Sequence, residues 1–234
     1  MDYAHSIPGR PHAEWECLKD HLENVSLCAS KFGAAFGCEA AASLAGQVHD
    51  IGKTSEQFQS YIRAVSSYSG TDHLRGGDHS TAGARVAVEQ YGQLGRLIAF
   101  GIAGHHAGLA DGCDLDRRLN ASSKQVPPYD GWEGHTRPLP DLRDLAPKSW
   151  RKLAAYKGYS HAFLARMLFS CLVDADFLQT ERFYAEAVGT AGARGGHEPV
   201  TVLLDRLRAC QAARTVSPTP LNELRAQVLD HAVD

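Results

Sequence analysis

The sequence has few features of a secreted, disulfide-linked or membrane-spanning protein. Its six cysteines form no C-x-x-C pair, so it supports neither a disulfide framework nor a cysteine-ligated zinc site. No apolar run approaches the roughly 20 residues that span a bilayer, and the N-terminus lacks the apolar core of a signal peptide. These absences predict a protein of the reducing cytoplasm that makes no membrane contact.

Several motifs of common enzyme classes are also missing. The sequence contains no G-x-x-x-x-G-K-[ST] phosphate loop, no G-x-S-x-G elbow and no H-E-x-x-H zinc motif. Its net charge of −3 leaves no overall basic footprint for nucleic acid. A nucleic-acid enzyme of this charge needs a local basic groove or a partner that delivers the strand. The local basic cluster, Arg137, Arg143, Lys148, Arg151 and Lys152, fits a solvated face slightly better than a DNA contact.

The dominant hydrophobic period is helical, and hydrophobic residues make up 44% of the chain, so we expect an all-α bundle with a sizeable core. Helices are predicted at 15–29 behind Pro11, 38–51, 55–61 with Thr54 as cap, 80–92, 97–104, 160–187, 200–210 and 221–233. Loops are predicted at 67–78 and, as a long irregular insertion, at 107–147; no strand is expected. A linker at 189–198 would separate a main domain, 1–188, from a helical tail, 189–234.

Histidine is the outlier of the composition, with 12 residues. Five histidines and two aspartates lie in or beside apolar, helix-like segments, where a polar ring or carboxylate is costly unless it has a partner. A metal cluster would supply that partner. These positions are His21, His49-Asp50, His79, His105-His106 and one aspartate within Leu172–Asp176.

Residues 49–53 read H-D-I-G-K at the end of an alanine-rich helix. Neighbouring side chains on a helix point about 100° apart, so His49 and Asp50 can flank a metal pair, with Asp50 bridging through its two oxygens. Gly52 would end the helix and open space for a phosphate, with Lys53 beside it as a point charge. The alternative is an exposed helix-end pair in which Lys53 complements the helix dipole.

His21 and His79 are weaker signals taken singly. His21 borders the buried face of its helix, where a lone histidine is more often a hydrogen-bonded core residue than a ligand. His79 follows Gly76-Gly77-Asp78, and Ser80 or Thr81 could cap the next helix. Equally, Asp78 or Ser80 could simply start that helix and leave His79 at the surface.

His105 and His106 end a short apolar helix among small residues, where they can reach one ion, or an ion and a bound phosphate; the alternative is a solvated helix terminus. Further along, the helical phase does not choose between Asp174 and Asp176. Imidazoles with a bridging carboxylate suit Mn, Fe, Co, Ni or Zn better than Mg. Two such ions roughly 3.5–4 Å apart would activate a water and polarise a phosphodiester.

Taken in order, these residues resemble a known family. His21, H-D-x-G-K at 49–53, D-H-S at 78–80, G-H-H at 104–106 and L-V-D-A-D-F at 172–177 resemble the HD-superfamily phosphohydrolases. More narrowly, the chain resembles the HD nuclease domain of the CRISPR-associated type I helicase-nuclease, as do Tyr3–Ser6, Phe58–Tyr61 and Asp78–Ala84. The resemblance covers residues 1–185 and implies an HD-domain helical bundle with a dinuclear metal site between its central helices.

The resemblance implies cleavage of single-stranded DNA with two divalent transition-metal ions, Mn, Fe, Ni or Co in preference to Mg or Zn. One ion would be held by His21, His49, Asp50 and the late-helix aspartate, and the other by Asp50, His79, His105 and His106. Lys53 would contact the phosphate or support the nucleophilic water. The family's aspartate usually follows a small residue and precedes an apolar one, which favours Asp176 and keeps Asp174 as an alternative.

The resemblance also implies partners: a helicase domain or subunit that feeds the strand, and a crRNA-guided surveillance complex that recruits the assembly. In most members the helicase follows in the same chain. This sequence contains none, yet Leu221–Arg225 resembles the connector, so we expect a fragment of a fusion rather than a stand-alone subunit.

Two other functions remain open. The chain could be an HD enzyme that hydrolyses nucleotides or cyclic nucleotides, in a pocket built by residues 107–147. It could also be a helical interaction module with one structural metal or none, although the full ligand set argues against that.

Overall fold

The computed structural model describes residues 1–67, 76–120, 126–147, 157–190, 198–213, 217 and 219–233. The chain separates into two compact units, Met1–Ala191 and Gly192–Asp234. The predicted linker falls at this division, although most of it lies outside the described residues. Among the described helices, none combines the length and the apolar character needed to cross a membrane.

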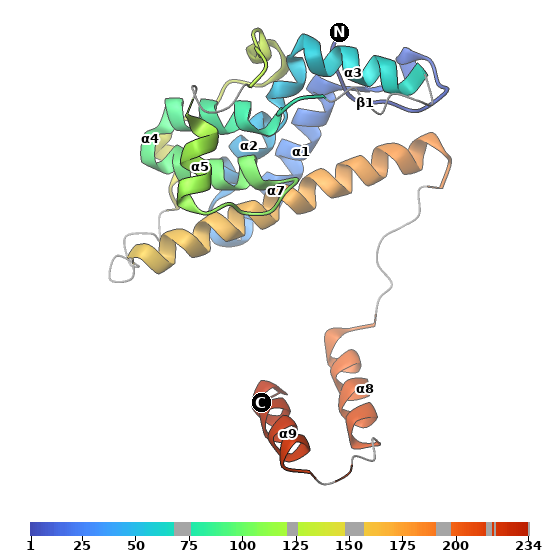
Figure 1. Ribbon diagram of the computed structural model, residues 1–234, viewed down its shortest axis with the longest axis vertical. Helices are drawn as coiled ribbons and strands as arrows, with labels where there is room; N and C mark the ends of the chain where they lie inside the picture. Colours follow the sequence, from blue (N-terminus) through green and yellow to red (C-terminus); the bar gives the residue numbers. More distant parts are fainter. Residues whose placement is uncertain are drawn as a thin grey trace. The chain divides into compact units, whose positions relative to one another are not determined.

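The first unit is a helical bundle, which confirms the expected all-α class. Four helices form its centre: α1 (Leu18–Gly33), α2 (Glu39–Val48), α4 (Ser80–Gly104) and α7 (Lys157–Ala187). Figure 1 shows α7 running along one side of the other three. Their apolar faces meet in a core that includes Leu22, Leu44, Ile102 and Leu172, all almost completely buried. Burial of such side chains is the main stabilising contribution to a bundle of this kind.

Shorter elements surround the four central helices. Before α1 come β1 (Tyr3–His5), η1 (His12–Glu14) and β2 (Glu16–Cys17), and η2 (Ala34–Phe36) follows α1. After α2 come η3 (Ile51–Thr54) and α3 (Glu56–Ser67), and between α4 and α7 lie α5 (Gly112–Leu119), η4 (Trp132–His135) and α6 (Leu142–Leu145). The second unit contains α8 (Val200–Ala212) and α9 (Pro220–Val233).

Two glycines allow α2 to approach both of its neighbours closely. A Cβ atom on Gly46 would lie 2.6 Å from the Cα of Ser26 in α1. A Cβ atom on Gly83 in α4 would lie 1.8 Å from the carbonyl oxygen of Val48. Because neither position has room for a side chain, the C-terminal end of α2 is held between α1 and α4.

Several local predictions were wrong. The segment before α1 was expected to be helical from Pro11 onward, but it forms an antiparallel ribbon in which Tyr3 pairs with Cys17 and His5 with Glu16. Strands of two or three residues are too short to show an alternating pattern, so periodicity could not reveal them. The cap of α3 is Ser55, whose Oγ accepts from the backbone N–H of Phe58 at 3.3 Å, and not Thr54.

The segments around α4 also differ from expectation. The two helices predicted at 80–92 and 97–104 are joined in α4, which kinks where Gly92 takes a φ of 55°. Glycine reaches this left-handed region without a steric penalty. The predicted irregular insertion contains α5, η4 and α6, and residues 121–125 of it lie outside the described residues, as do 68–75 of the predicted loop.

Gly83→Ala should destabilise the bundle, because backbone atoms of α2 leave no space for the added methyl group. We expect a loss of about 1–3 kcal/mol or more in the free energy of unfolding, measured by urea denaturation with circular dichroism. Gly112→Ala in α5 is the matched control, because a Cβ there meets nothing within 4 Å. Equal stability of the two variants would contradict the proposed close packing.

Candidate metal centre

The His49-Asp50 pair lies where α2 ends. His49 is the C-cap, with helical φ and ψ, whereas Asp50 leaves the helix at φ −116° and ψ 15°. This break brings the two side chains together instead of splaying them as on a continuous helix: Nε2 of His49 lies 3.4 Å from Oδ2 of Asp50. The predicted extension of this helix to Ile51 was therefore wrong.

The two carboxylate oxygens of Asp50 face different histidines. Oδ1 lies 3.4 Å from Nε2 of His105 and 3.6 Å from Nε2 of His79. Oδ2 lies 3.4 Å from Nε2 of His49 and 3.7 Å from Nε2 of His21. Asp50 is only 1% exposed, so this carboxylate sits in the interior between two groups of imidazoles.

These groups form two clusters that could each hold a metal ion. We call His21, His49 and Asp176 the inner cluster, and Asp50, His79, His105 and His106 the outer cluster. Within each, one candidate ligand atom per residue lies within 4.8 Å of all the others. The structure thus brings together every residue that the sequence singled out as a metal ligand.

Asp176 belongs to the inner cluster and Asp174 does not. Oδ1 of Asp176 lies 3.4 Å from Nε2 of His21 and 3.6 Å from Nε2 of His49. Asp174 is on the exposed side of α7. The tight packing of α7 against α1, which helical phase alone cannot specify, decides which of the two carboxylates points inward.

The clusters differ in their access to solvent. His21 and His49 are completely buried, so the inner cluster is closed. In the outer cluster His106 is exposed and His79 is partly exposed, and their Nε2 atoms lie 3.0 Å apart. The centre therefore opens to solvent through His79 and His106.

The residues fit a transition-metal ion. Ligands about 2.0–2.2 Å from an ion stand roughly 3–3.5 Å from one another, close to the distances between these side chains. Oδ1 of Asp50 and Nε2 of His105 are buried and have no hydrogen-bonding partner among the described residues. Burial of such atoms without a partner costs about 1–3 kcal/mol each, which coordination of a cation would offset.

Two of the histidines are oriented by their own helices. Nδ1 of His49 donates to the carbonyl of Gly46 at 2.9 Å, and Nδ1 of His105 donates to that of Ile102 at 2.7 Å. A carbonyl can only accept, so in both rings Nδ1 carries a proton and Nε2 turns to the centre. Each ring uses one of the carbonyls that a helix leaves unpaired at its C-terminus.

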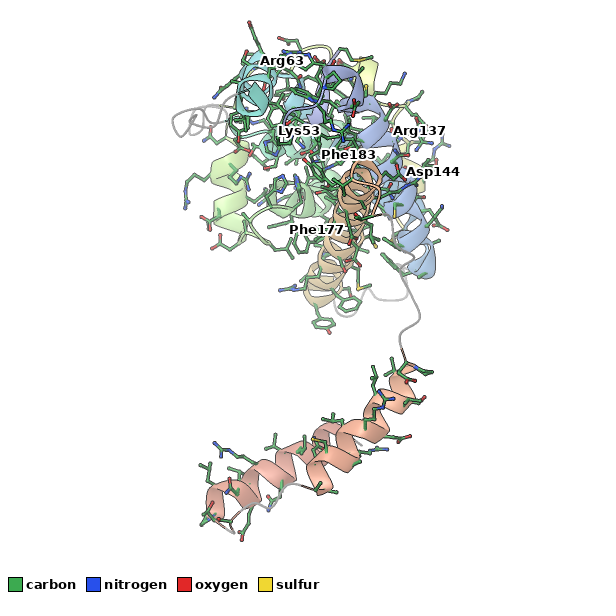
Figure 2. The ribbon with its side chains drawn as sticks, turned by 90° about the vertical axis from the view of Figure 1, so that its right-hand side faces the viewer. Lys53, Arg63, Arg137, Asp144, Phe177 and Phe183 are labelled. Atoms are coloured by element: carbon green, nitrogen blue, oxygen red, sulfur yellow. The ribbon has the colours of Figure 1, made fainter. Side chains whose placement is uncertain are left out.

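Gly52 and Lys53 differ from their predicted placement. A Cβ atom on Gly52 would lie 2.3 Å from the carbonyl oxygen of His79, so this glycine admits the backbone of His79 and does not open a space for phosphate. Lys53 is buried, with Nζ 2.6 Å from Oδ2 of Asp50 and 3.3 Å from the carbonyl of Ala4 (Figure 2). The alternative of an exposed helix-end pair was therefore wrong.

His79 is held in place by residues on both sides of it. Asp78 precedes α4, and its Oδ1 accepts from the backbone N–H of Thr81 at 3.1 Å. The N-cap position is His79 and the helix begins at Ser80, so the predicted caps Ser80 and Thr81 were wrong. Arg118 of α5 donates to Oγ of Ser80 at 2.8 Å and to Oδ1 of Asp78 at 3.3 Å. The insertion that was expected to be irregular thus supplies a helix that supports the outer cluster.

The sequence did not single out Glu16. Its Oε2 lies 2.6 Å from Nδ1 of His5 and 3.2 Å from Nδ1 of His21, and these three form a further group that could hold a metal ion. No periodic pattern marks Glu16, because it lies in a two-residue strand. His5 entered the prediction only through the resemblance of Tyr3–Ser6.

Protonation also differs between the clusters. Burial disfavours a charged imidazole, but the Asp50 and Asp176 carboxylates outweigh burial and raise the pKa of His49 to about 10. Burial dominates in the outer cluster, where it lowers the pKa of His79 and, with His105 nearby, lowers that of His106 to about 4. At neutral pH His49 therefore holds a proton that a metal ion must displace, whereas His79 and His106 are already neutral.

In comparisons with known proteins, no protein-family model matches the chain, and no curated protein matches it. The assignment of a function therefore depends on the geometry of the centre and on the motif resemblance.

We expect the chain to bind two divalent ions, one in each cluster, and Asp176→Asn to weaken one of them more than tenfold, because a carboxylate ligand is lost. Isothermal titration calorimetry with Mn²⁺ would measure the number of bound ions and the affinity of each. Asp174→Asn, two residues earlier on the exposed side of the same helix, is the control and should bind both ions normally. The reverse pattern in these two variants would contradict the placement of Asp176.

Metal binding should depend on pH differently in the two clusters. Because the pKa of His49 is raised, the inner ion displaces a proton, and its affinity should rise about tenfold per pH unit between pH 6 and 9. His106, whose pKa is lowered to about 4, should release no proton in this range. Titrations in buffers of different ionisation enthalpy count the protons released. Absence of proton release with either ion would contradict the assignment of His49.

Proposed function

We propose that this chain is a metal-dependent nuclease that cleaves single-stranded DNA during type I CRISPR interference. The observation that carries the proposal is the position of Asp50, which is buried between two histidine clusters with one oxygen toward each. A carboxylate placed in this way can bridge two ions, and paired ions are a recurrent solution for phosphodiester hydrolysis.

Two bound ions would supply a nucleophilic water near neutral pH and would polarise the phosphodiester. The inner cluster, sealed from solvent, would hold its ion permanently. His79 and His106, at the open side, would meet the phosphate of an approaching strand first. The closed side of the centre would thus hold an ion, and the open side would receive the substrate.

Lys53 would act on the bridging carboxylate rather than on the strand. Its Nζ lies 2.6 Å from Oδ2 of Asp50 inside the bundle, and this ion pair would hold the carboxylate in place and balance part of the charge of Asp50 and Asp176. Of the two roles expected of Lys53, support of the reacting water is therefore favoured over direct contact with a phosphate.

Two observations favour a nucleic-acid strand over a mononucleotide. Phe177, which directly follows Asp176 on α7, is 67% exposed and offers a ring face to an unstacked base (Figure 2). A nucleotide enzyme would instead need an arginine or aromatic clamp in a closed pocket. Arg118, which packs behind His79, is engaged by Asp78, Ser80 and the carbonyl of Ala103.

The partners belong to the same proposal. Arg137 of the predicted basic cluster donates to Oγ of Ser26 at 3.0 Å, and Lys148, Arg151 and Lys152 lie outside the described residues. A domain with net charge −3 would then receive its strand from a helicase domain or subunit, recruited in the cytoplasm by a crRNA-guided surveillance complex. The tail containing α8 and α9 would connect to that helicase.

The nuclease activity can be tested on circular single-stranded DNA with Mn²⁺ or Ni²⁺, beside deoxynucleotides and cyclic dinucleotides. We expect cutting of the DNA, and a loss of at least about 100-fold in Asp50→Asn. Asp174→Asn should cut normally. Hydrolysis of nucleotides without cutting of DNA would reject the proposal in favour of the phosphohydrolase alternative.

Asp50→Asn leaves Lys53 buried without its carboxylate, which can destabilise a protein by several kcal/mol. His106→Gln provides a second test without this effect, because His106 is exposed. Circular dichroism would establish that each variant keeps its helical content. Full DNA cleavage by well-folded His106→Gln and Asp50→Asn variants would overturn the assigned centre.

A further inference from the structure

We propose that Glu16 and His5 are positioning residues for His21, so that the N-terminal ribbon is a structural part of the inner metal cluster. This inference rests on the metal-dependent function proposed above. The ribbon contributes no residue to the inner or outer cluster, yet it lies directly behind His21. Its role would be to decide how firmly, and in which orientation, His21 presents Nε2 to the centre.

The pairing of β1 with β2 places the two side chains opposite each other. His5 is the register partner of Glu16, and Nδ1 of His5 lies 2.6 Å from Oε2 of Glu16. The same oxygen lies 3.2 Å from Nδ1 of His21, whose ring is completely buried. One carboxylate oxygen of Glu16 therefore lies close to two imidazoles, one from the ribbon and one from α1.

This arrangement selects the ring nitrogen that faces the ion. Nδ1 of His21 is buried and lies 3.2 Å from Oε2 of Glu16, without the geometry of a full hydrogen bond. Because a carboxylate oxygen can only accept, Glu16 would hold a proton on Nδ1 of His21 and leave Nε2 to face Asp50 and Asp176. A histidine that donates to a carboxylate is a more basic ligand than one that donates to a neutral group. His49 and His105 donate to backbone carbonyls, so among these three buried ligands His21 alone has a charged acceptor behind it.

The ribbon is fixed firmly enough to act as a support. Gln59 of α3 binds both backbone polar groups of Tyr3: its Oε1 accepts from the backbone N–H at 3.1 Å, and its Nε2 donates to the backbone carbonyl at 2.9 Å. Lys53, the partner of Asp50, donates to the carbonyl of Ala4. β1 is thus tied to the segment that follows Asp50.

The ring of His5 is also enclosed by aromatic side chains. Phe183 of α7 stacks on it at a centroid distance of 6.2 Å, and the His21 ring meets it edge-on at 4.8 Å. Tyr184 donates to the carbonyl of Ser6 at 3.3 Å. α7 therefore has two roles: it supplies the inner ligand Asp176, and it packs against His5, which lies behind the inner ligand His21.

His5, Glu16 and His21 could instead form a third metal site. An ion there would need the lone pair of Nδ1 of His21, while Nε2 of the same ring faces the inner cluster. One imidazole can serve both positions only by losing its last proton, which is far less accessible than donation of that proton to Glu16. The geometry therefore favours a charged support of His21 by Glu16 over a third ion.

The experiment is a Mn²⁺ titration of Glu16→Ala, without any nucleic acid. We expect the inner ion to bind about 10–100-fold more weakly, as is typical when the hydrogen-bonding partner of a metal-ligating histidine is removed. The outer ion should keep its affinity within about twofold and so reports that the fold is intact. Glu14→Ala is the matched control, because Glu14 lies nearby in η1, exposed, and pairs with Arg10; it should bind both ions normally.

Glu16→Gln keeps a hydrogen-bond acceptor but not the charge, so its loss of affinity for the inner ion should be smaller, about tenfold or less. If Glu16→Ala fails to fold, the Glu16→Gln titration tests the inference instead. Wild-type affinity for both ions in both Glu16 variants would overturn the inference. So would a third ion bound by the wild type and lost in Glu16→Ala. The readout is metal affinity, so a failure to cut DNA would refute the proposed function and leave this result unaffected.

Discussion

The rest of the centre depends on one buried charge, the carboxylate of Asp50. A carboxylate that is 1% exposed persists only where cations or hydrogen-bond donors surround it. The fold meets this requirement with Lys53 on one side and imidazoles on the others. The close contacts of Gly46 with α1 and of Val48 with Gly83 bring the end of α2 deep enough for these groups to reach it. The close packing at these glycines is therefore what allows the charge of Asp50 to be buried among its partners.

Four of the ligand histidines are supported in three different ways, and the supports come from separate parts of the chain. His49 and His105 use free carbonyls at the ends of their own helices. His21 relies on Glu16 in the ribbon, and His79 on a turn fastened by Arg118 of α5. Elements that look peripheral in the fold, the ribbon and the insertion, thus hold the side chains that the four central helices cannot orient alone.

The sequence was sufficient for the helical class, because period 3.6 is a local signal. Polar side chains in apolar segments indicated the other residues that gather at the centre, but Asp176 was chosen over Asp174 only through the family resemblance. The sequence was not sufficient for the supports. Glu16 meets His21 through strands too short to carry a period, and Gly52 matters because His79, 27 residues later, packs on it. Lys53 was expected beside a bound phosphate, because the turn at Asp50 that carries it inward depends on tertiary contacts.

The low charge of the chain is compatible with a polyanionic substrate once the ions are considered. Around the centre, two divalent cations together with Lys53 would outweigh the carboxylates of Asp50, Asp176 and Glu16, so the local potential would be positive although the net charge is −3. A potential confined to the opening at His79 and His106 attracts a phosphate only at that point. A centre with both ions bound would then act as its own basic patch and hold a strand only weakly elsewhere. This is compatible with the proposed delivery of the strand by a partner.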